Sequence, residues 1–118
     1  MPAQIAKKVA KIVGTDKQRI IGILGLSFKP GSDDVRDTPS AKIIKQLRLL
    51  GYTNIIGYDP VANAEFDRYY SDLAITYEQS YGELIRKAEV LVITTAWQEF
   101  ANIKQLTQKP VVDCRYML

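Results

Sequence analysis

The apolar run IIGILGL at residues 20–26 is the feature that most limits how this chain can fold. A short apolar run bounded by turn residues suits a strand that is covered on both faces, so we expect a buried strand of a parallel sheet here. A polar loop follows, and Thr38-Pro39 then begins a helix, because Thr38 can cap free amides and Pro39 has no N–H to leave unpaired. The sequence therefore predicts a strand, a charged loop and a helix in succession.

The rest of the chain repeats this alternation of strand and helix. Further strands are expected at residues 54–58, 73–76, 90–94 and 110–113, and helices at residues 4–13, 39–50, 62–70, 78–88 and 95–106. Such alternation predicts an α/β fold with a doubly wound parallel sheet, Rossmann-like, in a single three-layer domain with an N-terminal helix. A short amphipathic helix is marginal alone, so the N-terminal helix must pack on the body of the domain or on another chain.

Composition excludes several classes of protein. The 118 residues fit one domain, and Cys114 is the only cysteine in a chain without histidine. An internal disulfide, a multi-thiolate zinc site and Ser-His-Asp or Cys-His catalysis are therefore impossible within the chain, and we expect no metal site. The net charge of +3 does not indicate nucleic acid. No apolar run reaches the roughly twenty residues of a membrane span and no signal peptide is evident, so we expect a cytoplasmic protein with no membrane or nucleic-acid partner.

Cations gather where the predicted strands end. Open parallel sheets bind ligands at the carboxyl ends of their strands, and Lys29, Arg36 and Arg115 fall at that edge without an obvious carboxylate for each. Three converging cations favour an anionic ligand, and phosphate is the natural candidate. For Lys29 and Arg36 the alternative is a pair of solvated surface cations. The basic row on the helix at residues 39–50 is more simply a solvated face than a phosphate-binding ridge.

Asp59 ends the second predicted strand, where dinucleotide-binding folds place a ribose-binding carboxylate. Since no GxGxxG follows the first strand, Asp59 before a proline is at least as well explained as a turn residue. A phosphoacceptor receiver domain is another alternative, suggested by Asp33-Asp34 and Lys109-Pro110. The acids lie too deep in the loop and the Lys-Pro pair precedes a strand instead of following one, so we do not favour it.

Three segments together resemble a known family. The stretch GLSFKPGSDDVRDTPS with AKIIKQLRLLGYTNIIGYDP closely resembles the start of the C-terminal domain of the UDP-glucose/GDP-mannose dehydrogenase family. The segment VLVITTAWQEF is similar to the family's penultimate strand and its Thr-x-Trp-x-x-Phe motif, and VVDCRYML is similar to its closing Asp-Gly-Arg strand. The likeness spans nearly the whole chain.

The resemblance implies roles for four side chains. Phe28, Lys29 and Arg115 match positions that bind the sugar nucleotide, and Arg36 matches an arginine that contacts NAD between the two halves of the enzyme. Such enzymes oxidise a sugar's 6-hydroxymethyl group twice with NAD, through a thioester on a cysteine. Residues 1–15 match the end of the long interdomain and dimerisation helix, and residues 16–118 match the C-terminal sugar-nucleotide-binding domain.

The catalytic cysteine and the NAD fingerprint belong to an N-terminal dehydrogenase domain that this sequence lacks, so we expect no catalytic residue here and no turnover by this piece alone. Cys114 stands where the family usually has glycine and is best interpreted as a buried or half-buried thiol. We expect a homo-oligomeric UDP-glucose 6-dehydrogenase as parent, with a UDP-sugar substrate and NAD. The alternatives are a free-standing nucleotide-binding or regulatory module, or a parent acting on GDP-mannose or a UDP-N-acetylhexosamine.

Overall fold

A five-stranded parallel sheet forms the centre of the molecule. The computed structural model describes residues 2–118, and its strand order is β3-β2-β1-β4-β5. The strands are β1 (Ile21–Leu24), β2 (Ile55–Tyr58), β3 (Thr76–Tyr77), β4 (Val90–Ile93) and β5 (Val111–Asp113). The apolar run that opens the fold becomes β1, which lies between β2 and β4, so the most apolar segments occupy the middle of the sheet.

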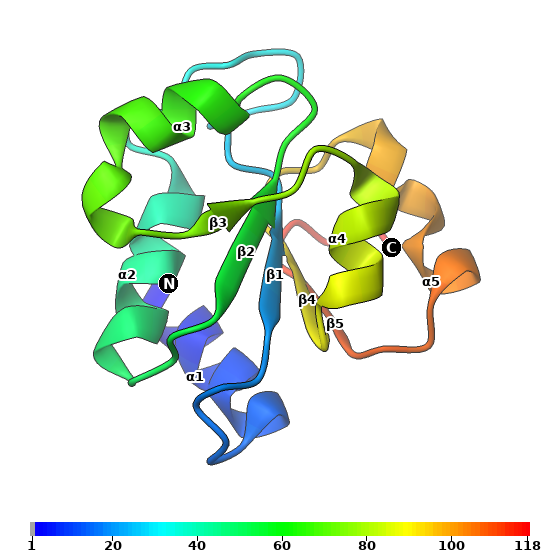
Figure 1. Ribbon diagram of the computed structural model, residues 1–118. Coiled ribbons are helices and arrows are strands. Elements are labelled where there is room, and N and C mark those ends of the chain that lie inside the picture. The colour runs from blue at the N-terminus through cyan, green and yellow to red at the C-terminus, as the bar shows by residue number, and fades with distance from the viewer. Residues whose placement is uncertain (1) are drawn as a thin grey trace.

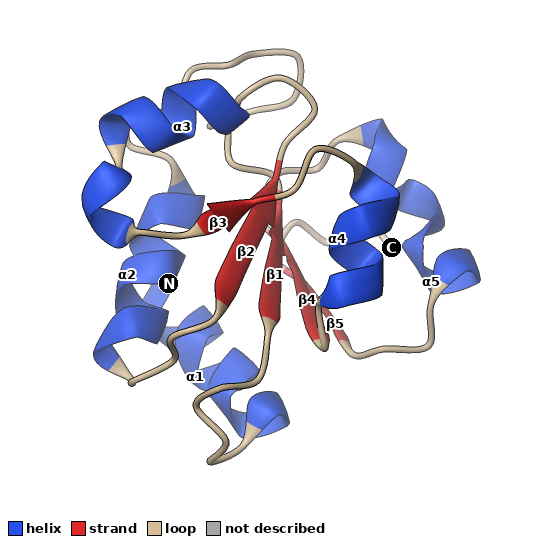
Figure 2. Cartoon of the chain, in the orientation of Figure 1, coloured by secondary structure: helices blue, strands red, loops and turns tan. Residues whose placement is uncertain are grey.

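Helices cover both faces of the sheet. They are α1 (Pro2–Val13), α2 (Pro39–Leu49), α3 (Asn63–Tyr69), α4 (Tyr81–Lys87) and α5 (Ile103–Leu106), with 3₁₀ turns at Ser71–Leu73 and Gln98–Asn102. The first three helices lie on one face, and α4 and α5 lie on the other (Figures 1 and 2). This arrangement confirms the predicted doubly wound, three-layer α/β domain.

Each face of the sheet has its own hydrophobic core. Ile21 and Ile23 of β1 contribute to the core beneath α1 and α2, whereas Leu24 contributes to the core beneath α4. The N-terminal helix buries Ala6 and Val9 on the first of these faces. It therefore packs on the body of the domain, one of the two outcomes expected for it. None of the helices in residues 2–118 is long and apolar enough to cross a membrane.

Arg48 belongs to the basic row of the helix at residues 39–50, but it is not the solvated cation expected for that row. Its guanidinium donates hydrogen bonds to the carbonyl oxygens of Thr53 at 2.6 Å, Leu73 at 3.0 Å and Ala74 at 2.9 Å. Residue 74 has left-handed backbone geometry, with φ of 54°. The strand expected at residues 73–76 is accordingly wrong, because a 3₁₀ turn held by Arg48 occupies its first half and β3 begins only at Thr76.

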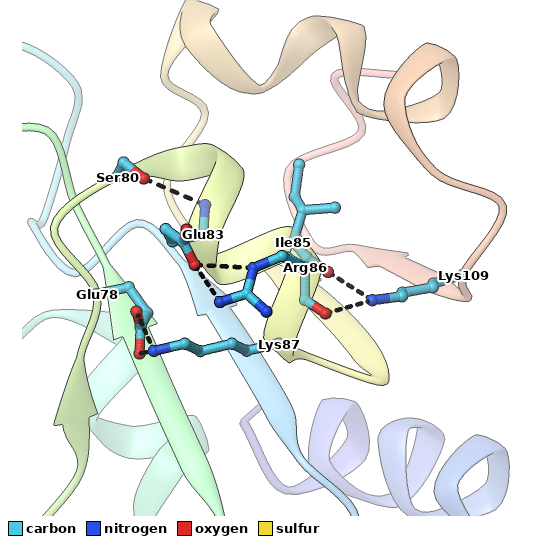
Figure 3. Close-up of polar contacts among 7 residues, drawn as sticks. All are labelled: Glu78, Ser80, Glu83, Ile85, Arg86, Lys87 and Lys109. Atoms are coloured by element: carbon cyan, nitrogen blue, oxygen red, sulfur yellow. Dashed lines mark hydrogen bonds and ion pairs between the residues drawn. The ribbon is translucent and has the colours of Figure 1, made fainter.

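Polar contacts hold α4 in place on the second face (Figure 3). The Ser80 hydroxyl accepts a hydrogen bond from the Glu83 amide at 3.1 Å, so the helix begins later than the expected residue 78. Glu78, which precedes the helix, forms an ion pair with Lys87 in its last turn at 3.0 Å. At the other end, Lys109 donates to the carbonyls of the last turn, 2.6 Å from that of Ile85. Side chains thus form hydrogen bonds with free backbone groups at both ends of this short helix.

Candidate functional site

The chain leaves β1 through a turn that needs glycine. Gly25 has φ of 98°, and a Cβ built there would lie 2.4 Å from Cβ of Thr95. The Thr95 hydroxyl donates to the carbonyl oxygen of Ser27 at 2.7 Å. The ends of β1 and β4 are therefore in direct contact, with no room for a side chain between them.

Asp59 lies at the centre of this strand-end region. Its side chain is buried, and the residue is 2% exposed. Oδ2 accepts hydrogen bonds from the amides of Leu26 at 2.8 Å and Ser27 at 3.0 Å, and from Nε1 of Trp97 at 3.1 Å. Oδ1 accepts from the amides of residues 61 and 62, both at 3.0 Å. These contacts favour the turn-residue interpretation over the ribose-binding one, because a fully engaged carboxylate has little left to offer a ligand.

Phe28 and Lys29 project from this region into solvent. Phe28 is 46% exposed, which is a large exposed fraction for an aromatic side chain, and Lys29 is exposed as well. The Phe28 amide donates to the carbonyl oxygen of Asp34 at 2.8 Å, which closes the loop on itself. No ion pair is formed by Lys29 within residues 2–118. A cation and an aromatic ring are thus presented together by a fixed backbone.

Arg36 does have a carboxylate partner, contrary to what we expected for the three cations. Its Nε and Nη2 donate to the two carboxylate oxygens of Asp34 at 3.0 and 2.9 Å. This paired hydrogen bond, together with the Arg36 amide, lowers the pKa of the Asp34 carboxyl to about 2. Arg36 therefore presents a largely neutralised pair to solvent, and only Nη1 remains without a partner in the described part of the chain.

The helix after this loop begins as predicted, but its capping differs. Thr38 is the N-cap residue and Pro39 is the first helical residue. The Thr38 hydroxyl makes no capping hydrogen bond and instead lies 3.0 Å from the Ser40 hydroxyl. Ser40 donates in turn to the carbonyl oxygen of Leu26 at 3.1 Å. The hydroxyls thus tie the start of α2 to the end of β1 and leave the first helical amides uncapped by Thr38.

Arg115 lines a cavity of about 510 Å³ between the start of α1, the start of α2 and the end of β5. Lys8 of α1 and Lys42 of α2 line the same cavity, so three cations surround it together with Arg115, which follows β5. Lys42 also pairs with Asp37 at 2.8 Å. The size suits a small organic ligand. Phe28, Lys29 and Arg36 are not among its lining residues. The cations selected from sequence are therefore divided between the β1 loop and this cavity.

Two lining residues show what the sequence did and did not reveal about the cavity. Lys8 and Lys42 were not selected as site residues from sequence. The signal that could have found Lys42 is its place in the first turn of α2, directly after the β1 loop. Lys8 lies in the middle of α1 and gave no such signal. Cys114 also lines the cavity and is half-buried, as expected. Burial raises the pKa of its thiol to about 11.

Residues 2–118 contain no cluster of three or more Asp, Glu, Cys or His residues that could hold a metal ion. What the strand ends offer is exposed positive charge, an exposed aromatic ring and a cavity, which together can bind an anionic, partly aromatic ligand.

Residues 22–118 match the model of the UDP-glucose/GDP-mannose dehydrogenase family, UDP binding domain. The chain belongs to this family. It is 32% identical over 113 residues to the UDP-glucose 6-dehydrogenase TuaD of Bacillus subtilis, with 92% of this chain and 24% of that protein covered. The chain thus spans about a quarter of the length of the curated relative that it matches.

Solved structures support the same assignment. A UDP-glucose dehydrogenase from the hyperthermophilic archaeon Pyrobaculum islandicum superposes with a TM-score of 0.86 at 30% identity, over 98% of this chain and 26% of that one. A ternary complex of GDP-mannose dehydrogenase from Pseudomonas aeruginosa superposes with a TM-score of 0.76 at 26% identity, over 98% of this chain and 28% of that one. The family therefore includes relatives named for two different nucleotide sugars.

Proposed function

We propose that this chain is the sugar-nucleotide-binding part of an NAD-dependent nucleotide-sugar 6-dehydrogenase that converts UDP-glucose to UDP-glucuronate by two successive oxidations. The observation that carries the proposal is positive charge at the carboxyl edge of the sheet, divided between exposed Lys29 and the cavity lined by Lys8, Lys42 and Arg115. A diphosphate is the anion that such lysines and an arginine bind well.

Roles for individual residues follow from the resemblance together with this geometry. Phe28, Lys29 and Arg115 bind the sugar nucleotide, and the exposed ring of Phe28 offers a surface for its base or sugar. Residues 1–15 serve as the end of the helix that joins the two halves of the parent enzyme, and residues 16–118 form the binding domain. An N-terminal dehydrogenase domain supplies the catalytic cysteine, and the parent is a homo-oligomer.

NAD accepts hydride in this chemistry. Arg36 fits a contact with the cofactor through its free Nη1, because Asp34 occupies the other side of the guanidinium and holds it in a fixed direction. The pairing with Asp34 engages Nε–H and one N–H of Nη2, so both N–H groups of Nη1 remain available to the cofactor in a fixed direction. In this proposal the residue orients a cofactor that is bound mainly by the N-terminal dehydrogenase domain of the parent enzyme.

Titration calorimetry of the 118-residue chain tests the proposal. We expect weak binding of UDP and UDP-glucose, because only part of the cleft is present, and about a tenfold loss of affinity in Lys29→Ala and in Arg115→Ala, since each removes a charged hydrogen-bonding partner. Lys104→Ala is the matched control, because it removes the same charge from exposed α5 on the opposite face of the sheet.

Two results would change the assignment. Equal affinity for UDP in the unsubstituted chain and both site variants contradicts the assigned roles. Tighter binding of GDP-mannose or of a UDP-N-acetylhexosamine than of UDP-glucose moves the substrate to that alternative while leaving the site in place.

A further inference from the structure

The Asp59 carboxylate has an unusual set of partners for a buried charge. Within residues 2–118 it has no lysine or arginine partner, and it is satisfied by neutral donors alone. These donors come from the ends of β1 and β2 and from the segment after β4. A buried carboxylate of this kind keeps a fixed geometry only while every donor stays in place, so it couples three strand ends.

Ser27 connects this carboxylate to the exposed loop. Its hydroxyl lies 3.0 Å from Oδ2 of Asp59 and 3.1 Å from the carbonyl oxygen of Lys29. Its amide donates to Asp59 and its carbonyl accepts from Thr95, so every polar group of this buried residue is engaged. The hydrogen bonds of Ser27 therefore fix the backbone conformation immediately before Phe28.

Trp97 completes the arrangement. Its Nε1 lies 3.1 Å from Oδ2 of Asp59 and 3.4 Å from the Ser27 hydroxyl. The indole thus closes the side of the carboxylate that faces the segment after β4. Because it is the only tryptophan in the chain, its fluorescence reports on this position alone.

We propose that Asp59, Ser27 and Trp97 form a positioning unit that fixes the direction of Phe28 and Lys29 toward the sugar nucleotide. The unit touches no ligand itself. It acts by setting the backbone from which the aromatic ring and the ammonium project, which lowers the cost of ordering them when a ligand binds. The inference rests on the proposed function, since it assumes that Lys29 binds the sugar nucleotide.

Ser27→Ala tests the unit. It removes the hydroxyl that lies near both Asp59 and the Lys29 carbonyl oxygen, while the hydrogen bond from the Ser27 amide to Asp59 remains. Ser40→Ala is the matched control, since Ser40 is an equally buried serine whose hydroxyl donates to a β1-end carbonyl but contacts neither Asp59 nor Lys29. We expect about a fivefold loss of UDP affinity in Ser27→Ala and none in Ser40→Ala. The change in Trp97 emission on adding UDP should shrink in Ser27→Ala only.

A double-mutant cycle separates positioning from general stability. In a Lys29→Ala background, Ser27→Ala should change UDP affinity by less than about twofold, because the side chain that it positions is gone. An undiminished loss in that background contradicts the inference, as does unchanged affinity in Ser27→Ala itself.

A ligand-free measurement keeps this test independent of the proposed function. Hydrogen exchange at the Phe28 and Lys29 amides should be about fivefold faster in Ser27→Ala than in Ser40→Ala. Equal exchange in the two variants overturns the positioning unit whatever the chain binds. Failure of the unsubstituted chain to bind UDP, with exchange altered as expected, counts against the proposed function and leaves the positioning of this loop standing.

Discussion

Asp59 and Asp113 are the same residue type at the carboxyl ends of two strands of one sheet, yet their surroundings differ sharply. Asp59 accepts six hydrogen bonds and is buried. Asp113 is partly exposed and accepts two, from the amides of Arg115 at 3.1 Å and Leu118 at 2.8 Å. Near the second aspartate, Tyr116 is 93% exposed.

The comparison separates two kinds of surface on one edge of the sheet. The end of β2 belongs to a buried polar network that holds the β1 loop before any ligand arrives. The end of β5 is a turn held by two amide hydrogen bonds beside a cavity, and Arg115 and Tyr116 are exposed there. Preorganised groups give affinity at low entropic cost, whereas adaptable groups accommodate different ligands. We expect the two ends to respond very differently to the same substitution.

The largest expected effect comes from truncating the buried aspartate. Asp59→Ala should lower the free energy of unfolding by about 3 kcal/mol, because it leaves several buried donors without an acceptor. Asp113→Ala should cost less than about 1 kcal/mol, since its two donors can turn to water. Urea denaturation followed by Trp97 fluorescence and by circular dichroism measures both changes. Similar losses in the two variants would show that the contrast between the strand ends is wrong.

Sequence alone anticipated the sheet and most elements for a clear physical reason. Long apolar runs such as residues 20–26 and 90–94 can be satisfied only by burial on both faces, and this largely fixes β1 and β4. The strand at residues 73–76 was misplaced because its boundary depends on Arg48, a contact 25 residues away in sequence. Local patterns carry no record of such long-range side-chain contacts.

The candidate site was only partly predictable for the same reason. Strand-end position selected Lys29, Arg36 and Arg115, but charge pairing depends on loop conformation, and the Asp34 to Arg36 pair was not foreseen. Lys8 joined the cavity through the packing of α1 against the body, which the sequence left open between two outcomes. The network around Asp59 gave one signal in sequence, an Asp-Pro turn. The turn accounts for the local partners of Asp59, whereas Leu26 and Trp97 lie more than thirty residues away in sequence.

The reactivity of Cys114 tests how well the turn after β5 protects its side chains from solvent. Because the pKa of its thiol is raised from 9.0 to about 11, the thiolate fraction at pH 8 should be about a hundredfold lower than that of an ordinary cysteine. Reaction with a thiol-specific disulfide reagent at pH 8 should be slower by at least that factor in the folded chain than in the same chain unfolded in urea. A ratio near one would mean that the turn after β5 opens readily and exposes the thiol.

The same thiol gives a pH dependence of known sign. Its folded pKa is raised, so its contribution to stability is complete below about pH 9 and is lost as the pH rises toward 11. Cys114→Ser should flatten part of this alkaline decline. The rest should remain, because burial also raises the pKa of Tyr81 to about 12. Unfolding curves from pH 7 to pH 11 on both chains distinguish the contributions.

The smallest effect is expected at the pair on the exposed loop. Arg36→Ala should return the pKa of Asp34 from about 2 toward 3.8, because the paired hydrogen bond is its largest cause, and NMR titration of the Asp34 carboxyl measures this directly. A lowered folded pKa gives stability that is present above pH 4 and lost as the pH falls toward 2. Because both side chains are well exposed, solvent screens the pair and this contribution is too small to change the free energy of unfolding at pH 7 measurably.

Arg36→Ala also tests which contacts hold the loop between β1 and α2. The amide of Phe28 and the buried Val35 do not depend on the guanidinium, and the Tyr70 hydroxyl donates to the carbonyl oxygen of Val35 at 2.7 Å. Amide chemical shifts at Phe28 and Lys29 should therefore be unchanged in Arg36→Ala, although they move in Ser27→Ala. If the two substitutions shifted these amide signals equally, the surface ion pair between Arg36 and Asp34 would contribute to the loop conformation as much as the buried hydrogen bonds at the strand ends.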